Sequence, residues 1–584
     1  MPVTRELPGE NHAEHVDTLI AAERARLYEQ AGIATAAPRH FKRPKEAPFV
    51  RSERASTTLL FGGLTLRHEK LVEAALLCNG YRPELIPTPR KADFQAGKEY
   101  GNNGQCNPTY FTVGALVNYL KNLRDNKGLS TEEIIRDYVY LTAGACGPCR
   151  FGMYEAEYRL ALRNSGFDGF RVIILQQSGG LNQTDVESGV TFNVDLTLSM
   201  LNAFCIGDVL NAVTYHVRPY ETVAGKSDEV FARCLEMVSE TMRAKDFAAV
   251  KPGITSRFLD KVLPSDSPET VAKLLDQLRG DYLTETLERC AALIQDEIEV
   301  DYLKPRPIVK ITGEFWAQTT EGDGNFRMFP FLEREGAEVL VEPIATWLDY
   351  LIGQATNKLK DSKGVIEDGA VLPAPGVLGR VGAAWDHRKK LLTLSLARKL
   401  LRREYDRFRG ALGGTVHELA DQPELQRVAH PYYNTRAEGG EGHLEVAKAI
   451  YYCNHSLAHM VLSLKPFGCM PSTQSDGAQA AVVSAFPDLL YIPVETSGEG
   501  DVNAHSRVQM ALGEAKVRAQ NEFKACVERT GYTLEQLREY VAAHRELRRP
   551  LLQVPHYEGV VGRAANFALY VGSLMAHVGA RGTN

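Results

Sequence analysis

The stretch Thr57-Thr-Leu-Leu-Phe-Gly-Gly63 sets the fold class of this chain. A short apolar run that ends in two glycines is typical of a buried strand that leads into a tight turn. An amphipathic helical pattern follows at about 68–78, and Glu84-Leu-Ile-Pro87 has the pattern of a second strand. The order strand, helix, strand predicts a βαβ unit, and therefore an α/β fold with a largely parallel sheet.

Patterns of the same kind continue outward from this unit along the chain. Helical spacing near 110–125 and 131–136 precedes strands at 138–142 and 170–175, with a helix between these strands. Further strands are predicted at 307–314, 338–342 and 489–495, and helices at 444–464 and 504–522. We therefore predict six parts: a helix and extended arm (1–55), a first α/β domain (56–190), a helical connecting region (191–304), a second α/β unit (305–411), an α/β unit with the Cys469 loop (412–531) and C-terminal helices (532–584).

The composition limits the class of protein. The 584 residues, 44% hydrophobic and 24% charged, are typical of a folded soluble protein of several domains. A net charge of -6 gives no reason to expect nucleic acid as a partner, and the basic helical run 389–408 is expected to be a solvated face. The N-terminal residues lack a secretory signal, so we expect a cytoplasmic protein with reduced cysteines. Arg563, Asn566 and His577 interrupt the apolar stretch 560–579, which favours a buried helix over a membrane span.

The ten cysteines fall into two groups. Four lie in loops rich in glycine and proline: Cys106 in Gly-Gln-Cys-Asn-Pro, Cys146 and Cys149 in Cys-Gly-Pro-Cys, and Cys469 in Gly-Cys-Met-Pro. The others lie mostly in apolar, helix-like runs, where a cysteine usually serves as a small core residue. These six are Cys78, Cys205, Cys234, Cys290, Cys453 and Cys526.

The loop cysteines are the candidates for chemistry. Cys146 and Cys149 follow a predicted strand, in a loop of the kind that forms binding sites in α/β folds. Their two-residue spacing lets two sulfurs reach one metal centre, but a redox-active dithiol and a zinc knuckle use the same spacing. Zinc normally requires a second close pair, whereas Cys106 and Cys469 are isolated. An iron–sulfur cluster tolerates such scattered ligands better and is therefore favoured, with a dithiol, zinc or inert thiols as alternatives.

Two carboxylates and three amides are candidates for supporting roles. Glu314 and Glu495 lie at or near the ends of predicted strands, where a carboxyl group can donate protons to a ligand, although capping or loop-fixing would also explain them. The amides of Asn102, Asn103 and Gln105 flank Cys106 and could donate hydrogen bonds to cluster sulfurs, or belong to an ordinary turn.

Histidines and glycine-rich loops give weaker indications. His455 and His459 are predicted to share one helical face at i and i+4, a spacing that can bind metal, with a surface or core role as the alternative. His430 and His505 are potential acids near neutral pH. The glycine-rich loops at 438–442 and 497–501 are predicted to be tight turns, because their acidic residues disfavour phosphate.

Several of these motifs resemble one known family. They are Glu99 to Gly114 around Cys106, Cys-Gly-Pro-Cys-Arg-Phe-Gly at 146–152, Ile-Thr-Gly-Glu at 311–314, Pro-Phe-Gly-Cys-Met-Pro-Ser at 466–472 and Val-Glu-Thr-Ser-Gly-Glu-Gly-Asp-Val-Asn-Ala-His-Ser-Arg at 494–507. These segments are similar to those of 2-hydroxyacyl-CoA dehydratases and their activase-related proteins. The likeness spans about 57–516 and is strongest at the cysteine loops.

The resemblance implies flavodoxin-like α/β domains with an iron–sulfur cluster, expected to be of the 4Fe-4S type, lodged between them. Carried over to this sequence, it makes Cys106, Cys149 and Cys469 ligands, and Cys146 either the fourth ligand or a thiol beside the cluster. A double-cubane cluster would need more thiolates, for which Cys205 is the one further candidate.

The resemblance also implies a partner and a function. In this family an ATPase activator with its own iron–sulfur cluster drives low-potential electrons into the cysteine-rich component. That component uses them for radical dehydration or reduction of a small substrate, such as a CoA thioester. The chain has no Gly-x-x-x-x-Gly-Lys-Ser/Thr loop, so ATP hydrolysis is assigned to another polypeptide. We therefore expect the iron–sulfur component of such an anaerobic system, with room for a homo-oligomer; the alternative is a non-catalytic electron-transfer or assembly module.

Overall fold

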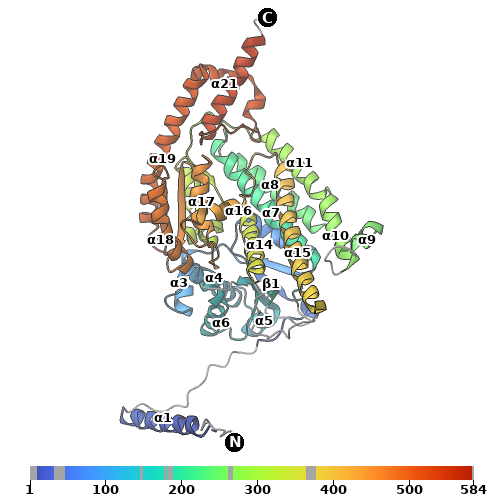
Figure 1. Ribbon diagram of the computed structural model, residues 1–584, viewed down its shortest axis with the longest axis vertical. Helices are drawn as coiled ribbons and strands as arrows, with labels where there is room; N and C mark the ends of the chain where they lie inside the picture. Colours follow the sequence, from blue (N-terminus) through green and yellow to red (C-terminus); the bar gives the residue numbers. More distant parts are fainter. Residues whose placement is uncertain are drawn as a thin grey trace. The chain divides into compact units, whose positions relative to one another are not determined.

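The computed structural model of the protein describes residues 10–31, 46–144, 149–176, 180–181, 189–260, 267–362, 377–437 and 439–581. The chain divides into two units, residues 1–46 and 47–584. The first contains helix α1 (Glu10–Gln30), which exposes Leu19, Ile20 and Leu27. The second is built around two parallel sheets (Figure 1). The predicted N-terminal helix and the predicted α/β fold class are both confirmed.

The first sheet has the strand order β2-β1-β3-β4-β5, in which four strands are parallel and the short β5 is antiparallel. Its strand β1 is buried throughout because apolar residues point to both faces, so that Leu59 and Leu60 enter two different hydrophobic cores. The elements of this part are β1 (Thr58–Phe61), α2 (Leu66–Cys78), β2 (Arg82–Leu85), α3 (Lys91–Tyr100), α4 (Asn107–Asp125), α5 (Thr131–Asp137), β3 (Tyr138–Gly144), α6 (Tyr154–Asn164), β4 (Arg171–Gln176) and β5 (Gly180–Leu181).

The second sheet has the order β7-β6-β8-β9, with all strands parallel. Counted within each sheet, the parallel strands of both follow the order 2-1-3-4, which is that of flavodoxin. Because β6 pairs with β8, the segments 305–411 and 412–531 contribute to a single sheet. The elements are β6 (Ile308–Gly313), α12 (Phe315–Thr319), α13 (Met328–Arg334), β7 (Glu338–Leu340), α17 (Leu444–Asn454), β8 (Met460–Pro466), α18 (Met470–Ala485), β9 (Tyr491–Thr496) and α19 (Asp501–Thr530).

The predicted helix at 444–464 is wrong in its second half. Helix α17 ends at Asn454, Ser456 adopts a positive φ of 51°, and Met460–Pro466 forms the inner strand β8. Both halves are rich in apolar residues, so composition does not distinguish a buried strand from a buried helix here. The polar residues at 454–456 mark the real boundary.

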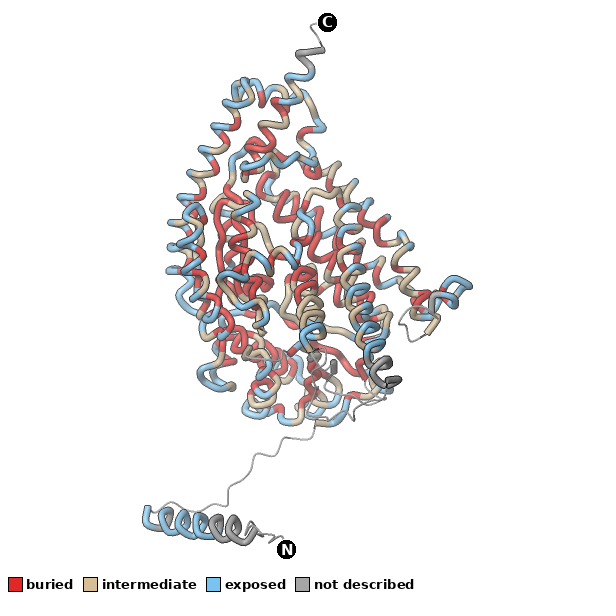
Figure 2. Tube along the Cα trace, in the orientation of Figure 1, coloured by how far each residue is buried: buried red, intermediate tan, exposed pale blue. Residues whose placement is uncertain are grey.

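Helices fill the space beside the two sheets. The region predicted to be helical, 191–304, contains five α-helices, and further helices follow β7 and β9 (Figure 1). Among the described residues one helical stretch, Val194–Tyr220, is long and apolar enough to cross a membrane, but 72% of its apolar window is buried inside the protein (Figure 2). The helices are α7 (Val194–Val217), α8 (Lys226–Arg243), α9 (Ile254–Asp260), α10 (Pro268–Arg279), α11 (Tyr282–Glu297), α14 (Ile344–Asp361), α15 (Val377–Ala411), α16 (Gln422–Ala429), α20 (Leu534–Ala543) and α21 (Arg563–Arg581).

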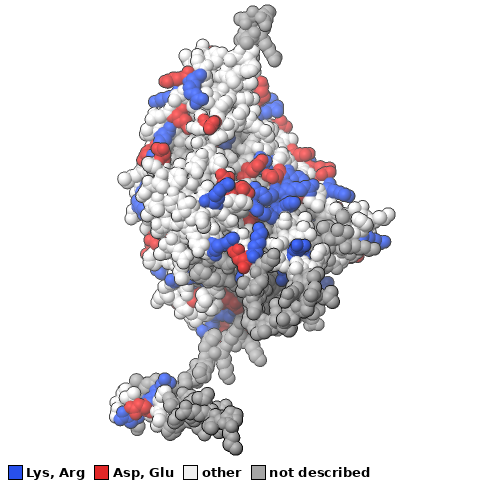
Figure 3. Space-filling model, viewed as in Figure 1, with Lys and Arg blue, Asp and Glu red and all other residues white. Residues whose placement is uncertain are grey.

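The predicted basic run 389–408 lies within α15. Several lysines and arginines of this helix are exposed to solvent, namely Arg388, Lys389, Lys390, Lys399 and Arg403. Figure 3 shows Lys and Arg side chains gathered on the face that carries this helix. The exposed part of the run agrees with a solvated helix face, whereas Arg398 and Arg402 pair with the buried Asp349, and Arg407 pairs with the buried Glu404.

The two sheets meet near the carboxyl ends of their first strands. A Cβ atom added at Gly63, just after β1, would lie 3.7 Å from Nε1 of Trp316, just after β6. The Trp316 ring packs on Phe111 of α4 at 5.6 Å between ring centroids, within a cluster that also contains Phe94 and Tyr110. In parallel sheets the loops at these strand ends, where the strand order reverses, are the usual ligand sites. The fold therefore brings together the strand-end loops of the two sheets, each of which is a usual position for a ligand site.

Candidate site of thiols and carboxylates

Each of the three described loop cysteines stands directly before a helix. Cys106 precedes α4, Cys469 precedes α18, and Cys149 precedes a short 3-10 turn, Arg150–Met153, that continues into α6. Proline in the first turn of α4 and α18 fixes these helix starts, because its missing N–H is not needed there. The positive ends of the helix dipoles therefore point toward the thiols.

The loops of Cys106 and Cys469 touch through their backbones. The N–H of Asn107 donates to the carbonyl of Phe467 at 3.1 Å. A Cβ atom added at Gly468, which has φ 75°, would lie 3.5 Å from Cα of Cys106. Loops that are more than 350 positions apart in sequence are thus held side by side where the two sheets meet.

Burial and neighbouring acids keep the three thiols protonated. Burial, together with the charges of Glu314 and Cys106, raises the pKa of Cys149 to about 12. Burial also raises the pKa of Cys469, with additional contributions from Glu314 and Cys149. The pKa of Cys106 is raised by burial and by Glu314, against hydrogen bonds with Thr109 and Tyr154. The structure thus brings Cys106, Cys149 and Cys469 into one electrostatic neighbourhood, whereas Cys146 lies outside the described residues.

Two hydroxyl groups hold the sulfur of Cys106. Thr109 Oγ1 lies 3.1 Å and Tyr154 Oη 3.2 Å from Sγ. The sequence-based hypothesis assigned such contacts to Asn102 and Gln105, but their side-chain amides both donate to Oε1 of Glu157, at 2.7 and 3.0 Å. These residues therefore follow the alternative reading of an anchored turn. Two further flanking residues also point elsewhere: Asn103 is exposed, and Arg150 donates to the carbonyl of Gly104.

Of the two predicted carboxylates, one joins the cysteines. Glu314 is the N-cap of α12, where its Oε2 accepts a hydrogen bond from the N–H of Ala317 at 2.9 Å. Burial raises the pKa of Glu314 to about 7, and its charge acts on all three described thiols. Glu314 therefore both caps α12 and lies close enough to the cysteines for its charge to affect them. Glu495 is exposed on β9, and no contact in the described part of the chain joins it to the cysteines.

The glycine-rich loop after residue 438 adds a carboxylate that the sequence did not single out. Gly440 and Gly442 have φ 58° and 53°, and a Cβ atom on them would collide with Pro471 and with the Tyr350 hydroxyl. The predicted tight turn is confirmed, and it carries Glu441 inward to 3% exposure. Burial, reinforced by Glu314, raises the pKa of Glu441 to about 8. The sequence signal for a buried carboxylate here is a single acidic residue, Glu441, between two glycines.

Next to Glu441 lies a buried histidine. His443 has no exposed surface, and neither ring nitrogen makes a hydrogen bond within the described part of the chain. Its ring packs against Tyr350 at 5.2 Å between centroids. Burial lowers the pKa of His443 to about 4, so the ring is neutral at physiological pH.

A layer of buried charges separates the second sheet from α17. Nζ of Lys310, on β6, lies 2.5 Å from Oε2 of Glu342. Nζ of Lys465, on β8, lies 3.1 Å from Oε1 of Glu445, on α17. Lys448, one turn further along α17, has its Nζ 3.8 Å from Oε2 of Glu441. This layer cannot be predicted from the sequence. A single lysine within an apolar strand does not change the strand pattern, and nothing in the sequence indicates which carboxylate it will contact.

The predicted histidine pair is not formed. His455 ends α17 and its Nε2 lies 3.0 Å from Glu424, whereas His459 precedes β8 and its Nδ1 accepts the N–H of Ile308. The two side chains therefore belong to different elements, and the i, i+4 hypothesis is wrong. His505 contacts the Phe326 carbonyl through Nε2 at 2.7 Å, and His430 is exposed.

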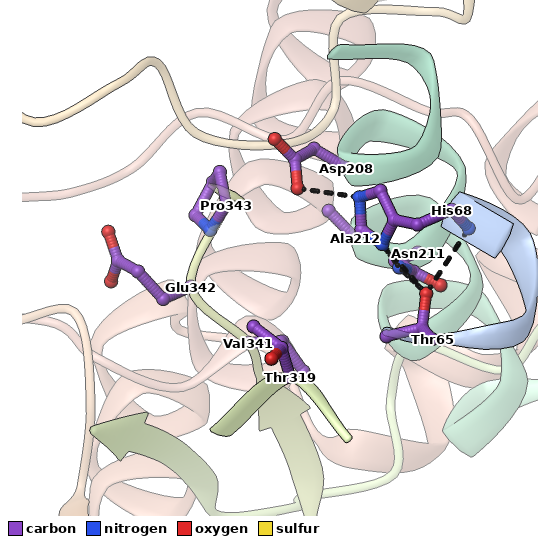
Figure 4. A pocket seen from close by; sticks show the side chains of 9 residues that line it. All are labelled: Thr65, His68, Asp208, Asn211, Ala212, Thr319, Val341, Glu342 and Pro343. Atoms are coloured by element: carbon purple, nitrogen blue, oxygen red, sulfur yellow. Dashed lines mark hydrogen bonds and ion pairs between the residues drawn. The ribbon is translucent and has the colours of Figure 1, made fainter. Parts of the chain in front are cut away.

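A chain of three buried polar groups lies further from the cysteines. Thr65 Oγ1 is 2.8 Å from Nδ1 of His68, whose Nε2 is 3.0 Å from Oδ1 of Asp208 (Figure 4). The Asp208 carboxylate also accepts the N–H groups of Ile344 and Ala345 at the start of α14. The adjoining cavity has a volume of about 10 Å³, close to that of one water molecule. This arrangement links α2, α7 and α14 and leaves no room for a substrate.

Of the six remaining cysteines, Cys205, Cys234, Cys290 and Cys526 are buried, as predicted for those in apolar runs, whereas Cys78 and Cys453 are partly buried. Cys205, Cys234 and Cys290 have no exposed surface and lie in the largest hydrophobic core, which leaves Cys205 unsuited to a second cluster. Within the described ranges, which exclude Cys146, no group of three His, Cys, Asp or Glu side chains is arranged to hold a metal ion. A scan against models of known protein families gives no match, and neither does a search of curated proteins.

Proposed function

We propose that this chain is the iron–sulfur component of a dehydratase or reductase system, with Cys106, Cys149 and Cys469 as cluster ligands and Cys146 as the fourth. It receives low-potential electrons from a separate ATP-hydrolysing activator that carries its own cluster. It uses them to dehydrate or reduce a small substrate, for which a CoA thioester is the expectation from the resemblance. The observation that carries the proposal is that Cys106 and Cys469, both buried, lie in loops that touch between two parallel sheets, and that the partly buried Cys149 interacts electrostatically with both.

The charge of the site supports a metal-containing group. The three thiols share their surroundings with the carboxyl groups of Glu314 and Glu441, whose charges both act on Cys149. Thiols in such surroundings lose their protons only if a strong positive charge compensates them, and metal ligation deprotonates a coordinating thiol outright. The N-termini of α4 and α18 supply part of that positive potential. The donor set therefore fits a thiolate-bound cluster.

Chain residues around the thiols would control the group once bound. An iron–sulfur cluster supplies one-electron chemistry at a potential set by charge, hydrogen bonds and solvent exposure. Thr109 and Tyr154 are placed to donate hydrogen bonds to the Cys106 sulfur, which stabilises negative charge there. Glu314, with a pKa near neutrality, can hold a proton at Oε1 while Oε2 remains fixed by the Ala317 N–H.

The test is anaerobic purification of the full chain with analysis of iron and acid-labile sulfide. We expect a brown protein with about four iron atoms per chain if a single 4Fe-4S cluster is present. Serine in place of Cys106, Cys149 or Cys469 should remove most of the iron, and Cys146→Ser tests the fourth position. Cys453→Ser is the matched control, since Cys453 is a partly buried thiol on α17 outside this site.

The outcomes separate the proposal from its alternatives. A colourless protein without labile sulfide would overturn it, and zinc in place of iron would indicate a zinc site. Iron that stays bound in all four loop variants would refute the ligand assignment. Cluster-loaded protein that accepts electrons from an activator but converts no hydroxyacyl or enoyl thioester would favour the electron-transfer module.

A further inference from the structure

A row of buried charges leads from the cysteine site into the second sheet unit. Nζ of Lys448 lies 3.8 Å from Oε2 of Glu441 and 4.0 Å from Oε2 of Glu342. Nζ of Lys310 lies on the far side of Glu342, at 2.5 Å. None of these side chains is more than 4% exposed. Carboxylate and ammonium groups thus alternate through the interior.

The inner end of this row reaches a cavity of about 50 Å³. Glu342, Thr346, Tyr405 and Tyr452 line it, and so do residues 415–418, of which His417 and Glu418 are exposed to solvent. This volume is several times the minimum that one water molecule needs. Glu342 also lines the smaller cavity beside His68 and Asp208 (Figure 4). The larger cavity therefore lies between Glu342 and two residues with solvent-exposed surface, His417 and Glu418.

The contacts along the row differ from those of a structural ion pair. Glu441 accepts no hydrogen bond within the described residues, and Lys448 approaches it only to 3.8 Å. Charge-assisted hydrogen bonds are normally 2.7–2.9 Å long, whereas a separation near 4 Å suits a bridging water. Leaving both oxygens of a buried carboxylate unbonded costs stability, so a structural role does not explain Glu441.

The pKa values of Glu441 and Lys310 both lie close to neutral pH. Burial raises the pKa of Glu441 to about 8, whereas burial lowers that of Lys310 to about 8. Groups of this kind can exchange protons near physiological pH. The titratable groups around the row are Lys310 of β6, Glu314 before α12, Glu342 after β7, Tyr405 of α15, His443 before α17, Glu445, Lys448 and Tyr452 of α17, and Lys465 of β8.

We propose that Glu342, Lys448 and Glu441 form a path that delivers protons from the cavity to the place where Cys106, Cys149 and Cys469 meet. The inference rests on the proposed function, because electron-driven chemistry there consumes protons. A two-electron reduction takes two electrons from the donor protein and two protons from the path. A dehydration needs one proton, since the hydroxyl group leaves as water, and returns one from a carbon of the substrate. In each delivery Glu441 releases a proton, Lys448 replaces it, and a proton from the cavity restores Lys448 beside Glu342, which its two lysine neighbours hold as a carboxylate.

The experiment follows proton uptake when the cluster-loaded full chain is reduced. Titanium(III) citrate serves as reductant in weakly buffered solution, and a pH indicator reports uptake in a stopped-flow instrument. The added electron places negative charge near Glu441, so the wild type should take up protons as it is reduced. Lys448→Met should slow this uptake at least tenfold while the amount of cluster stays the same, and Lys448→Arg should restore part of the rate.

Lys465→Met is the matched control, because Lys465 is equally buried against the same helix but lies off the row, paired with Glu445 and Asp476. Its uptake should equal that of the wild type. Glu342→Gln changes little in volume and gives a second reading if Lys448→Met does not fold. Unchanged uptake in Lys448→Met and Glu342→Gln, or an equal loss in Lys465→Met, would overturn the path while leaving the cluster assignment intact. A chain that binds no cluster would overturn both.

Discussion

The two sheets of the molecule share one strand order but differ in what is buried on them. In the first sheet Leu59 and Leu60 of β1 fill hydrophobic cores on both faces. In the second, Val309 and Ile311 of β6 do the same on one face, while Lys310 and Thr312 alternate with them and are buried under α17 without any exposed surface. One topology thus encloses an apolar interior in one case and a charged layer in the other.

This difference shows that the strand order does not require a layer of buried charges. Burying paired charges gains little stability over apolar residues of similar volume and often loses some. The inner strand β1 of the first sheet forms without a charged residue, and the buried charge of that sheet, Arg171 at the start of β4, pairs with Glu53. Lys310, Glu342, Lys448 and Glu441 are therefore better explained by chemistry at the adjoining site than by folding.

Lys310→Met should give the largest loss of stability. Removal of the ammonium group leaves the buried Glu342 carboxylate without its closest partner, at 2.5 Å in the wild type. Breaking one half of a buried ion pair costs about 3–5 kcal/mol. Urea unfolding of the metal-free protein at neutral pH measures this loss. The double variant Lys310→Met with Glu342→Gln should recover most of it, and a single variant as stable as the wild type would mean that the charged layer is not tightly coupled.

In the first sheet, Leu60→Ala should cost stability without any link to pH. Leu60 has no exposed surface and packs against Leu116 and other residues of the same core. Loss of a buried leucine side chain costs about 2–5 kcal/mol, through lost transfer energy and the cavity left behind. The loss should be equal at pH 6 and pH 8 in urea unfolding, because no titratable group is removed. A loss that changed with pH would show that the first sheet is not the apolar reference that its residues indicate.

The parts of this fold that depend on local pattern were predicted from sequence. The strand at 57–63 and the helix after it follow from apolar spacing and glycine, and the structure adds a threonine N-cap, Thr65, whose hydroxyl accepts the His68 N–H. The sequence predicts a helix where the strand β8 forms, because an apolar run that is buried on both faces shows no strand periodicity. Pairing with β6 and β9, which are far away in sequence, decides that it is a strand.

The residues of the candidate site also fall into those that local sequence predicts and those that only tertiary packing identifies. Cys106, Cys149 and Cys469 were recognised because glycine and proline surround each of them. Glu441 and Lys448 could not be assigned a role, since a single acid in a glycine run and a single lysine in an apolar helix have no partner at a fixed spacing. They acquire one only when α17 packs on the second sheet and brings Lys448 to Glu441 and Glu342.

Glu441→Gln should flatten the pH dependence of stability. An unfolded glutamate loses its proton above about pH 4.5, whereas the folded Glu441 has a pKa of about 8. The folded state therefore binds more protons within this window, and the free energy of unfolding falls as pH rises through it. The slope contributed by one such group is at most about 1.4 kcal/mol per pH unit, or roughly 2 kcal/mol from pH 6 to pH 8. Urea unfolding of the metal-free wild type and variant measures the difference.

The exposed Glu495 provides the control for that comparison. Glu495→Gln lies on the same sheet but on a solvent-exposed position of β9, so its pH profile should match that of the wild type. If Glu441→Gln also kept the full slope, the carboxyl group of Glu441 would not be the buried acid that its surroundings indicate.

Asn102→Ala should have the smallest effect, and it tests the contrast between two buried carboxylates. Glu157, in the first unit, accepts hydrogen bonds from the backbone and side chain of Asn102 and from Gln105, whereas Glu441 accepts none in the described residues. Glu157 is therefore an anchor for the Cys106 loop, and loss of one of its bonds should cost about 1 kcal/mol. Asn103→Ala, at the exposed neighbouring position, should cost nothing measurable. Asn102→Ala should also leave the pH profile between pH 6 and pH 8 unchanged, because the substitution removes no titratable group. A change in that profile would place Glu157 with Glu441 among the groups that exchange protons, and would remove the distinction between the two units.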